Sequence, residues 1–364
     1  MSKRKITVLW RIIKKELEEE IKDASFGDRF YTIDEICEKY KVSRITAQRV
    51  LRELRNEGFL DTGSGRANVI RRINKDINIY LIIPSTFSDK SLTMNPIVKI
   101  HSGIIDEAKE LKVNIDYLSE QYLPWRISNI RDKNKSIGFI FLGRGVEKTK
   151  EIVRKYNIPF VVFADSEVET EDFSVGIDKR YGAYITVKHL ISLGHRRIGF
   201  ITGPVESIHY FPRYEGYKKA IEKNGIEYDS ALIEETTGKN IEEDIRAFEK
   251  LINLTHPPTA IFTANDWRGI HILEYCNKKG IKIPEEISIA GFDNIRESLY
   301  TTPPLTTVET HRKETGKEAV KMLVYLLSGR GNGLIPKRRI IFKPELVIRK
   351  STGMLRELLK ERRE

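Results

Sequence analysis

Three side chains in the second half of the chain have the chemistry needed to hold a polyol. Arg213, Asn265 and Asp293 carry planar donors or acceptors that can each engage two adjacent hydroxyl groups. Turns also favour aspartate, so the alternative role for Asp293 is to cap the Gly-Phe-Asp-Asn turn. Trp267 follows Asn265-Asp266 directly, and it would either stack on a ligand or pack where its helix begins.

A second set of residues, near the N-terminus, has the pattern of a helix that meets DNA. Residues 33–40 and 44–55 have apolar positions at helical spacing, and Ser43 is a suitable N-cap for the second segment. A short helix, a turn and a second basic helix suit docking in the major groove, and glycines at 63 and 65 suit a two-stranded wing. The polar side chains expected to face mostly outward from the second helix are Arg44, Thr46, Gln48, Arg49, Arg52 and Arg55.

The charge distribution agrees with a DNA partner for the N-terminal part. Residues 1–75 hold 18 Lys and Arg against 12 Asp and Glu, a net charge of +6 out of +11 for the whole chain. Attraction to phosphates supplies most non-specific affinity for DNA. Any one of these arginines could simply belong to a solvated helix face, but an ordered set on one helix beside a glycine-rich wing favours DNA.

The rest of the composition excludes several classes of protein. No apolar run reaches 18 residues, so no membrane span is expected, and the N-terminal stretch does not resemble a secretory signal. Cys37 and Cys276 lie far apart and are expected to stay reduced in the cytoplasm. With only two glutamines among many lysines and glutamates, the composition is also that reported for proteins of hot environments.

Motifs for a metal, a cofactor or catalysis are missing from the sequence. The seven histidines are scattered and no Cys-x-x-Cys occurs, so we expect no metal. Gly143-x-Gly145 follows an apolar run but lacks the third glycine of a dinucleotide-binding loop. Asp178 and Asp293 could imitate the carboxylate pair of a glycosidase, but nothing indicates a raised pKa for either. We therefore expect neither a cofactor nor an enzyme.

From residue 77 onward, short apolar runs alternate with helical patterns. This alternation predicts an α/β fold with parallel sheets and right-handed crossovers, which binds ligands at the carboxyl ends of its strands. The expected strands are 77–84, 114–118, 137–142, 159–163, 198–202, 260–263 and 287–292. The expected helices are 96–111, 146–156, 180–193, 212–224, 266–279 and 311–328. Candidate contacts at strand ends are Asp165, Asp178, Thr202-Gly203-Pro204, Asn265-Asp266 and Asp293-Asn294.

Six motifs over residues 77–353 resemble the lactose/galactose-repressor (LacI/GalR) family when taken in order. The first is His189-Leu-Ile-Ser-Leu-Gly-His-Arg-Arg-Ile-Gly-Phe-Ile-Thr-Gly-Pro204. The others are Arg213-x-x-Gly216-Tyr217, Pro258-Thr-Ala-Ile-Phe-Thr-Ala-Asn-Asp266, Ile283-Pro-Glu-Glu-Ile-Ser-Ile-Ala-Gly-Phe-Asp293-Asn294, Thr302-Pro-Pro-Leu-Thr-Thr-Val308 and Pro344-Glu-Leu-Val-Ile-Arg-Lys-Ser351.

This resemblance implies two periplasmic-binding-protein-like (type I) subdomains joined by three chain crossings, with a ligand in the cleft between them. It places the guanidinium of Arg213 on sugar hydroxyls, with Asn265 and Asp293 on the opposite wall. A loop of the first subdomain, residues 85–95, should add contacts. The full set of expected effector-binding residues is Arg213, Asp293, Asn265, His209, Asp178 and Trp267.

The N-terminal segment resembles the GntR family of bacterial transcription regulators. Val42-Ser43-Arg44-x-Thr46 and Leu51-x-x-Leu54-x-x-x-Gly58-Phe-Leu match that family, and Gly63-x-Gly65 matches its wing. The resemblance implies a winged helix-turn-helix; a basic contact used by some relatives would fall near Asp34 and is expected to be absent. Expected DNA-contacting residues are Ser43, Arg44, Ile45, Thr46, Gln48, Arg49, Ser64, Gly65 and Arg66.

A GntR head joined to a LacI-type sensor resembles the arabinose-responsive repressors. We therefore expect a homodimer, formed through the sensors, that binds a palindromic operator and is released by a small sugar, with L-arabinose favoured. The alternatives are a corepressor-dependent or activating regulator, a solute receptor and a sugar enzyme. The expected domains are 1–67 (DNA binding), 68–76 (linker), 77–353 (sensor and dimerisation) and 354–364 (helical tail).

Overall fold

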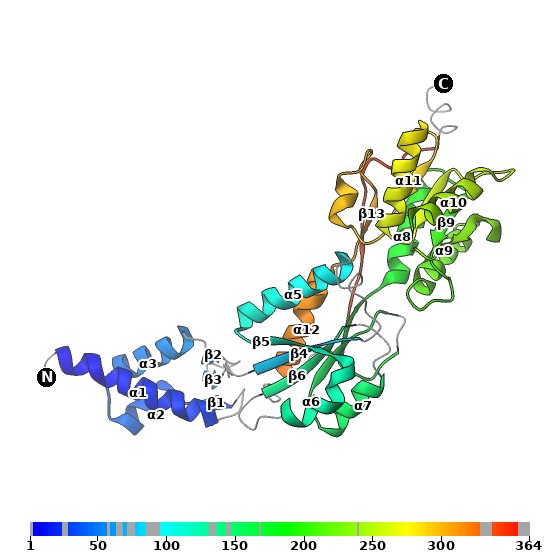
Figure 1. The fold of residues 1–364 in the computed structure, drawn as a ribbon. Helices are drawn as coiled ribbons and strands as arrows, with labels where there is room; N and C mark the ends of the chain where they lie inside the picture. Colours follow the sequence, from blue (N-terminus) through cyan, green and yellow to red (C-terminus); the bar gives the residue numbers. More distant parts are fainter. Residues whose placement is uncertain are drawn as a thin grey trace.

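The computed structural model places an N-terminal unit and two α/β subdomains in a row (Figure 1). Both cysteines are free thiols, as expected. The residues that the structure describes are 3–23, 28–56, 59–62, 68–70, 77–84, 95–130, 136–142, 147–166, 169–238, 240–327 and 337–355.

The N-terminal unit combines three helices with a small antiparallel sheet. The helices are α1 (Lys3–Asp23), α2 (Ile33–Tyr40) and α3 (Arg44–Asn56). The strands are β1 (Arg29–Phe30), β2 (Leu60–Thr62) and β3 (Asn68–Ile70), in the order β1-β3-β2. Residues 68–70 were expected in a linker, and this was wrong because they form the middle strand of the sheet. The remaining expected linker, 71–76, lies outside the described residues.

Local capping explains where the two short helices begin. Thr32 and Glu35 form a reciprocal capping box at the start of α2, and Lys41 ends that helix in the left-handed conformation. The Ser43 hydroxyl accepts the Thr46 N–H at 3.4 Å, which confirms Ser43 as the N-cap of α3.

Helix α1 was not predicted, and it forms part of the core of the N-terminal unit. Ile13, Leu17 and Ile21 recur at helical spacing on α1, and all three are buried. They share one hydrophobic cluster with Val50 and Leu54 of α3. Helix α3 is therefore held in place by α1 as well as by α2.

The first subdomain is a six-stranded parallel sheet with helices on both faces. The sheet order is β14-β8-β7-β6-β4-β5. The strands are β4 (Ile77–Ile83), β5 (Asn114–Ser119), β6 (Ser136–Phe141), β7 (Phe160–Phe163), β8 (Ser174–Ile177) and β14 (Arg339–Phe342). The helices are α5 (Asn95–Leu111), α6 (Leu123–Ile130), α7 (Glu147–Lys155) and α12 (Arg312–Leu327). One buried cluster joins the sheet to α5 and α12, and another joins it to α6 and α7.

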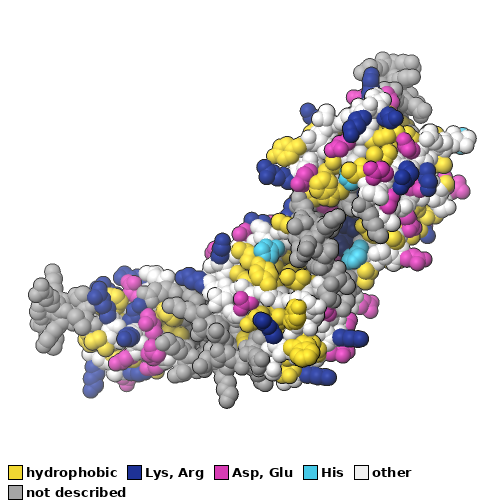
Figure 2. Space-filling view, viewed as in Figure 1, with side chains coloured by type: hydrophobic (Ala, Val, Ile, Leu, Met, Phe, Trp, Pro, Cys, Tyr) yellow, Lys and Arg dark blue, Asp and Glu magenta, His cyan; other side chains and the backbone are white. Residues whose placement is uncertain are grey.

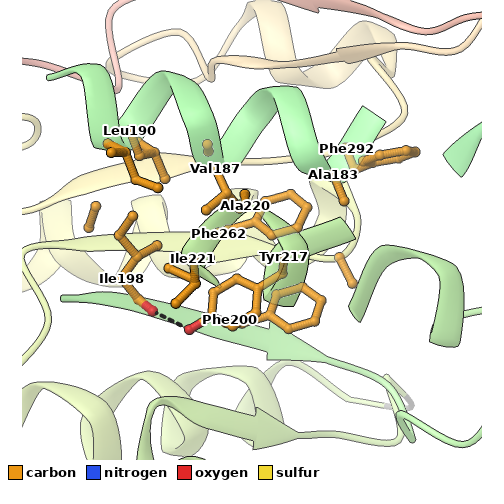
Figure 3. Close-up of a cluster of buried hydrophobic side chains, with 14 of the residues drawn as sticks. Ala183, Val187, Leu190, Ile198, Phe200, Tyr217, Ala220, Ile221, Phe262 and Phe292 are labelled. Atoms are coloured by element: carbon orange, nitrogen blue, oxygen red, sulfur yellow. Dashed lines mark hydrogen bonds between the residues drawn. The ribbon is translucent and has the colours of Figure 1, made fainter. Parts of the chain in front are cut away.

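The second subdomain repeats this plan with a four-stranded parallel sheet, ordered β10-β9-β11-β12. Its strands are β9 (Ile198–Thr202), β10 (Ile233–Glu235), β11 (Ala260–Thr263) and β12 (Ser288–Ala290). Its helices are α8 (Lys179–Ser192), α9 (Phe211–Lys223), α10 (Ile241–Ile252) and α11 (Asp266–Lys279). On the α8–α9 face, Phe200 stacks between Tyr217 and Phe262, and the Tyr217 hydroxyl donates to the Ile198 carbonyl at 2.8 Å (Figure 3).

The chain crosses between the subdomains three times, as expected. It leaves the first after β8, returns between β13 (Thr307–Glu309) and α12, and leaves again between β14 and β15 (Glu345–Val347). Strands β13 and β15 form a small antiparallel sheet. The sequence analysis missed α6, α10 and the short strands β8, β10 and β13 to β15. Of the expected helical tail, 354–355 are not helical and 356–364 lie outside the described residues.

Replacing Leu17 with alanine tests the contribution of α1. Leu17 is fully buried, so Leu17→Ala should lower the free energy of unfolding of the N-terminal unit by about 2–5 kcal/mol. Hydrogen–deuterium exchange should then accelerate in residues 28–56 and stay unchanged in 198–327. Leu9→Ala is the matched control because Leu9 is exposed on the same helix. Unchanged exchange in residues 28–56 of the Leu17→Ala protein would contradict this packing.

Candidate functional site

Arg213 and Asp293 form a buried charged pair at the carboxyl-end edge of the second sheet. Arg213 lies in the first turn of α9, which follows β9, and Asp293 follows β12. They are only 5% and 6% exposed, and their closest charged atoms are 3.5 Å apart. Strand ends of parallel sheets are where such folds bind ligands. The two predicted residues are thus in contact at the edge where a ligand is expected; placing them on opposite walls was wrong, because both follow strands of the second sheet.

The Arg213 guanidinium is only partly satisfied by the protein. One terminal nitrogen donates to the His209 carbonyl at 2.8 Å, and the group lies 4.4 Å above the Phe292 ring. Its Nε has no hydrogen-bond partner although it is buried. A buried donor without an acceptor is costly. The Arg213 Nε is therefore a donor that the described protein atoms leave without an acceptor.

Two further cations complete the charged cluster. Arg312, the first residue of α12, approaches the Asp293 carboxylate to 2.9 Å, and Lys179, the first residue of α8, pairs with Asp165 at 2.5 Å. Burial lowers the pKa of Lys179, the charges of Arg213 and Arg312 lower it further, and Asp165 opposes that shift. The three cations and two carboxylates thus form one electrostatic unit.

The sequence analysis named Asp165 but missed Lys179 and Arg312. Both residues begin a helix directly after a chain crossing. That position is the feature of the sequence by which they could have been found. A lysine or arginine at a helix start is disfavoured by the helix dipole. A cation at a helix start therefore indicates a functional role more strongly than a cation at a helix end.

The other predicted effector residues have local contacts of their own. Asp178 caps α8, where it accepts the Tyr181 N–H at 2.9 Å and the Ser166 hydroxyl at 3.1 Å. Asn265 caps α11 by accepting the Arg268 N–H at 3.0 Å. These caps place both side chains at helix starts that face the same edge as Arg213 and Asp293.

His209 and Trp267 are more exposed than the charged pair. His209 contributes its backbone carbonyl to Arg213, while its residue as a whole is exposed. Trp267 is 39% exposed, and its ring lies 6.3 Å from that of His271, one turn along α11. The expected loop 85–95 lies almost entirely outside the described residues, as does the Gly143-x-Gly145 turn.

Buried Asp266 anchors the turn that carries Asp293. Its carboxylate accepts the Ile295 N–H at 2.8 Å and a hydrogen bond from the Thr307 hydroxyl. Burial raises the pKa of Asp266 to about 8, and the nearby charge of Asp293 also raises it. The sequence analysis had paired this residue with Asn265 as a ligand candidate, but its full burial makes it structural.

The outward face of α3 is smaller than its periodicity predicts. Ile45 is 79% exposed, and Gln48 is exposed as well. Arg44 is exposed but pairs with Asp34 of α2. Thr46 was expected to face outward, and this was wrong because it is buried, with its hydroxyl 3.1 Å from that of Ser43.

The remaining candidate DNA contacts are Arg49 of α3 and the three wing residues. The Arg49 guanidinium lies 4.4 Å above the Trp10 ring of α1, so part of its charged group is committed to packing. The wing residues Ser64, Gly65 and Arg66 lie outside the described residues.

Comparisons with known proteins identify the family. Residues 187–352 match the model of the periplasmic binding protein-like domain. The HTH-type transcriptional repressor CytR of Escherichia coli is 31% identical over 328 residues, covering 86% of this chain and 90% of CytR. The chain belongs to the LacI family of transcriptional regulators. The family assignment makes it a ligand-responsive repressor rather than an enzyme.

Other relatives and solved structures agree with the LacI-family assignment. The NTD biosynthesis operon regulator NtdR of Bacillus subtilis is 30% identical over 349 residues, covering 88% of this chain and 99% of NtdR. A LacI-family regulatory protein from Chloroflexus aggregans has 26% identity and a TM-score of 0.65, covering 76% of this chain and 98% of that one. The CelR–cellobiose complex has the same fold, with 21% identity and a TM-score of 0.63, covering 85% and 92%.

The described residues contain neither a membrane-spanning helix nor a metal-binding cluster. None of the helices described is long and apolar enough to cross a membrane. Within the same residues, no group of three or more His, Cys, Asp or Glu could hold a metal ion.

The raised pKa of Asp266 predicts how stability depends on pH. Its pKa of about 8 in the folded protein lies above the ordinary aspartate value of 3.8, so between these pH values the folded state keeps a proton that the unfolded state releases. Stability should therefore fall as pH rises from 5 to 8, by at most about 1.4 kcal/mol per pH unit. Asp266→Asn should flatten this dependence in urea unfolding.

Asp106→Asn is the control for this titration because Asp106 is a surface aspartate, paired with Lys313. It should keep the wild-type decline between pH 5 and 8. Parallel curves for the wild type and Asp266→Asn would show that Asp266 does not hold a proton in the folded protein.

Proposed function

We propose that this LacI-family regulator is a cytoplasmic sugar-responsive repressor that leaves its operator when a small sugar binds beside Arg213 and Asp293. The observation that carries this proposal is the buried guanidinium with an unfilled Nε next to a buried carboxylate. A guanidinium fork and a carboxylate together suit adjacent hydroxyls, as donor and acceptor respectively. L-Arabinose is the favoured effector because the combination of head and sensor resembles arabinose-responsive repressors.

We propose further that the N-terminal unit is a winged helix-turn-helix of the GntR type. An antiparallel pair, β2 and β3, follows the two helices α2 and α3, which is where a wing belongs. Ser43, Arg44, Ile45 and Gln48 supply the face that would enter the major groove. Membership of the family suggests a LacI-type head as the alternative; the three-stranded sheet is the observation that favours a wing.

The sensor is proposed to be the dimerisation unit as well. Val98 of α5 and Tyr117 of the edge strand β5 are about half exposed, and Trp125 of α6 is 81% exposed. Apolar side chains gather on this face of the first subdomain, over α5 and β5 (Figure 2). Exposed apolar patches of this kind mark interaction surfaces. A symmetric dimer through this face would present two heads to a palindromic operator.

Fluorescence anisotropy on DNA from upstream of the protein's own gene tests the proposed function. At fixed salt, L-arabinose should release the wild type, whereas other monosaccharides should act only at higher concentration. Asp293→Asn keeps the size of the side chain and should lose the response, because the sugar loses its carboxylate acceptor. Tightening by a sugar would make the protein corepressor-dependent, and no response to any sugar would overturn the sugar proposal.

The recognition-helix assignment is tested separately with Arg44→Ala. Arg44 is exposed at the start of α3, and loss of a base or phosphate contact there should weaken operator binding by about 1–3 kcal/mol. Arg197→Ala is the control because Arg197 lies in the second subdomain, paired with Asp229. Unchanged operator affinity of Arg44→Ala in the same anisotropy assay would remove α3 from the DNA interface.

A further inference from the structure

The turn that carries Asp293 has an unusual backbone. Asp293 and Asn294 both have positive φ, 105° and 47°, and neither is a glycine. Side chains with a Cβ avoid this region unless the surroundings hold them there. Here the Asp293 N–H donates to the Val308 carbonyl at 3.1 Å, and the Asn294 N–H donates to the Thr307 hydroxyl at 3.2 Å. The left-handed region is one that Asn and Asp adopt more readily than other residues, so Asp293 at φ 105° is the less common of the two, and both N–H groups of the turn are bound by β13.

Both long helices of the first subdomain contact this turn of the second subdomain. Arg312 of α12 donates to the Asp293 carboxylate at 2.9 Å. Lys99 of α5 donates to the Asn294 carbonyl at 2.8 Å and lies 3.7 Å from the Glu309 carboxylate. Glu309 in turn accepts the Asn294 side-chain amide at 2.7 Å. Lys99 thus binds the far side of the turn, on its backbone and its supporting carboxylate, rather than the Asp293 side chain.

The two helices pack too closely to move independently. A Cβ at Gly103 of α5 would collide with the Lys313 carbonyl of α12, and a Cβ at Gly316 of α12 would collide with the Ile100 carbonyl of α5. At both glycines the backbone of one helix lies directly against the backbone of the other. No side chain at these points could move aside to let the helices shift. A displacement of either helix start would therefore be passed to the other helix.

We propose that Lys99 couples effector binding at Asp293 to the position of the α5–α12 helix pair, without touching the effector itself. The inference rests on the proposed function, because it requires Asp293 to bind the effector. An effector that draws the Asp293 carboxylate toward its hydroxyls also shifts the turn, because the backbone of the turn has few other conformations. Lys99 then transmits this shift to α5, whose outer face carries the exposed Val98 of the proposed dimer surface.

Lys99→Met tests this coupling because it keeps the length of the side chain and removes its hydrogen bonds. L-Arabinose affinity of the DNA-free protein, from titration calorimetry, should stay within about twofold of wild type. Coupling between sites typically changes affinity by about 5–150-fold, and the sugar-induced loss of operator affinity should shrink at least about fivefold in this variant. Lys99→Arg should retain most of the coupling, since it can still donate to Asn294.

Lys313→Met is the matched control. Lys313 also joins α12 to α5, through a 2.7 Å ion pair with Asp106, but that pair is exposed and does not include the turn. Its coupling should equal that of the wild type. If Lys99→Met unfolds, Lys99→Leu gives the same comparison, because leucine also lacks a hydrogen-bond donor.

The outcomes separate the two proposals. A wild type that responds to L-arabinose, with full coupling in Lys99→Met or in Lys99→Leu, would overturn the coupling role and leave the proposed function intact. An equal loss of coupling in Lys99→Met and Lys313→Met would also overturn the coupling role of Lys99, because any contact between α5 and α12 would then be enough to produce the coupling. A wild type that no sugar releases would overturn the proposed function and this inference with it.

Discussion

The charged cluster around Asp293 is the interaction on which the arrangement of the two subdomains depends. Arg213 of the second subdomain and Arg312 of the first subdomain both approach the Asp293 carboxylate. Arg312 begins α12, directly after a chain crossing. Buried charges are tolerated only when they are paired, and removing one partner leaves the other uncompensated. The relative position of the subdomains is therefore tied to the same carboxylate that is proposed to bind the effector.

A second buried polar network fixes the loops beside this cluster. Asp244 of α10 accepts the Thr236 hydroxyl at 2.9 Å and contacts His271 of α11 at 2.8 Å. Arg268 donates to the Thr236 hydroxyl at 3.0 Å, and its guanidinium lies 5.3 Å from the centre of the Tyr210 ring. Because each side chain in the network supplies a hydrogen-bond partner to another, the network ties the strand-end loops of the second sheet to one another.

The N-terminal unit shows how tertiary contacts select among side chains that periodicity treats alike. Arg44, Thr46 and Arg49 all fall on the polar side of the α3 pattern. In the folded unit, Arg44 is exposed beside Asp34, Thr46 is buried against Ser43, and Arg49 lies over an aromatic ring of α1. The face available to DNA is therefore a property of the whole unit.

The sequence by itself determined the α/β plan of the sensor and two of its central residues. Strands 198–202 and 260–263 and helix 266–279 have the predicted limits, because strands buried between two helical layers are apolar throughout. Arg213 and Asp293 were found from residue types and motif order. Only the tertiary structure revealed Lys179 and Arg312, because their partners are brought near by chain crossings rather than by local spacing. It also decided the roles of α1 and β3: the helical spacing of apolar residues in α1 does not say what the helix packs against, and a three-residue strand is stabilised only by its neighbours.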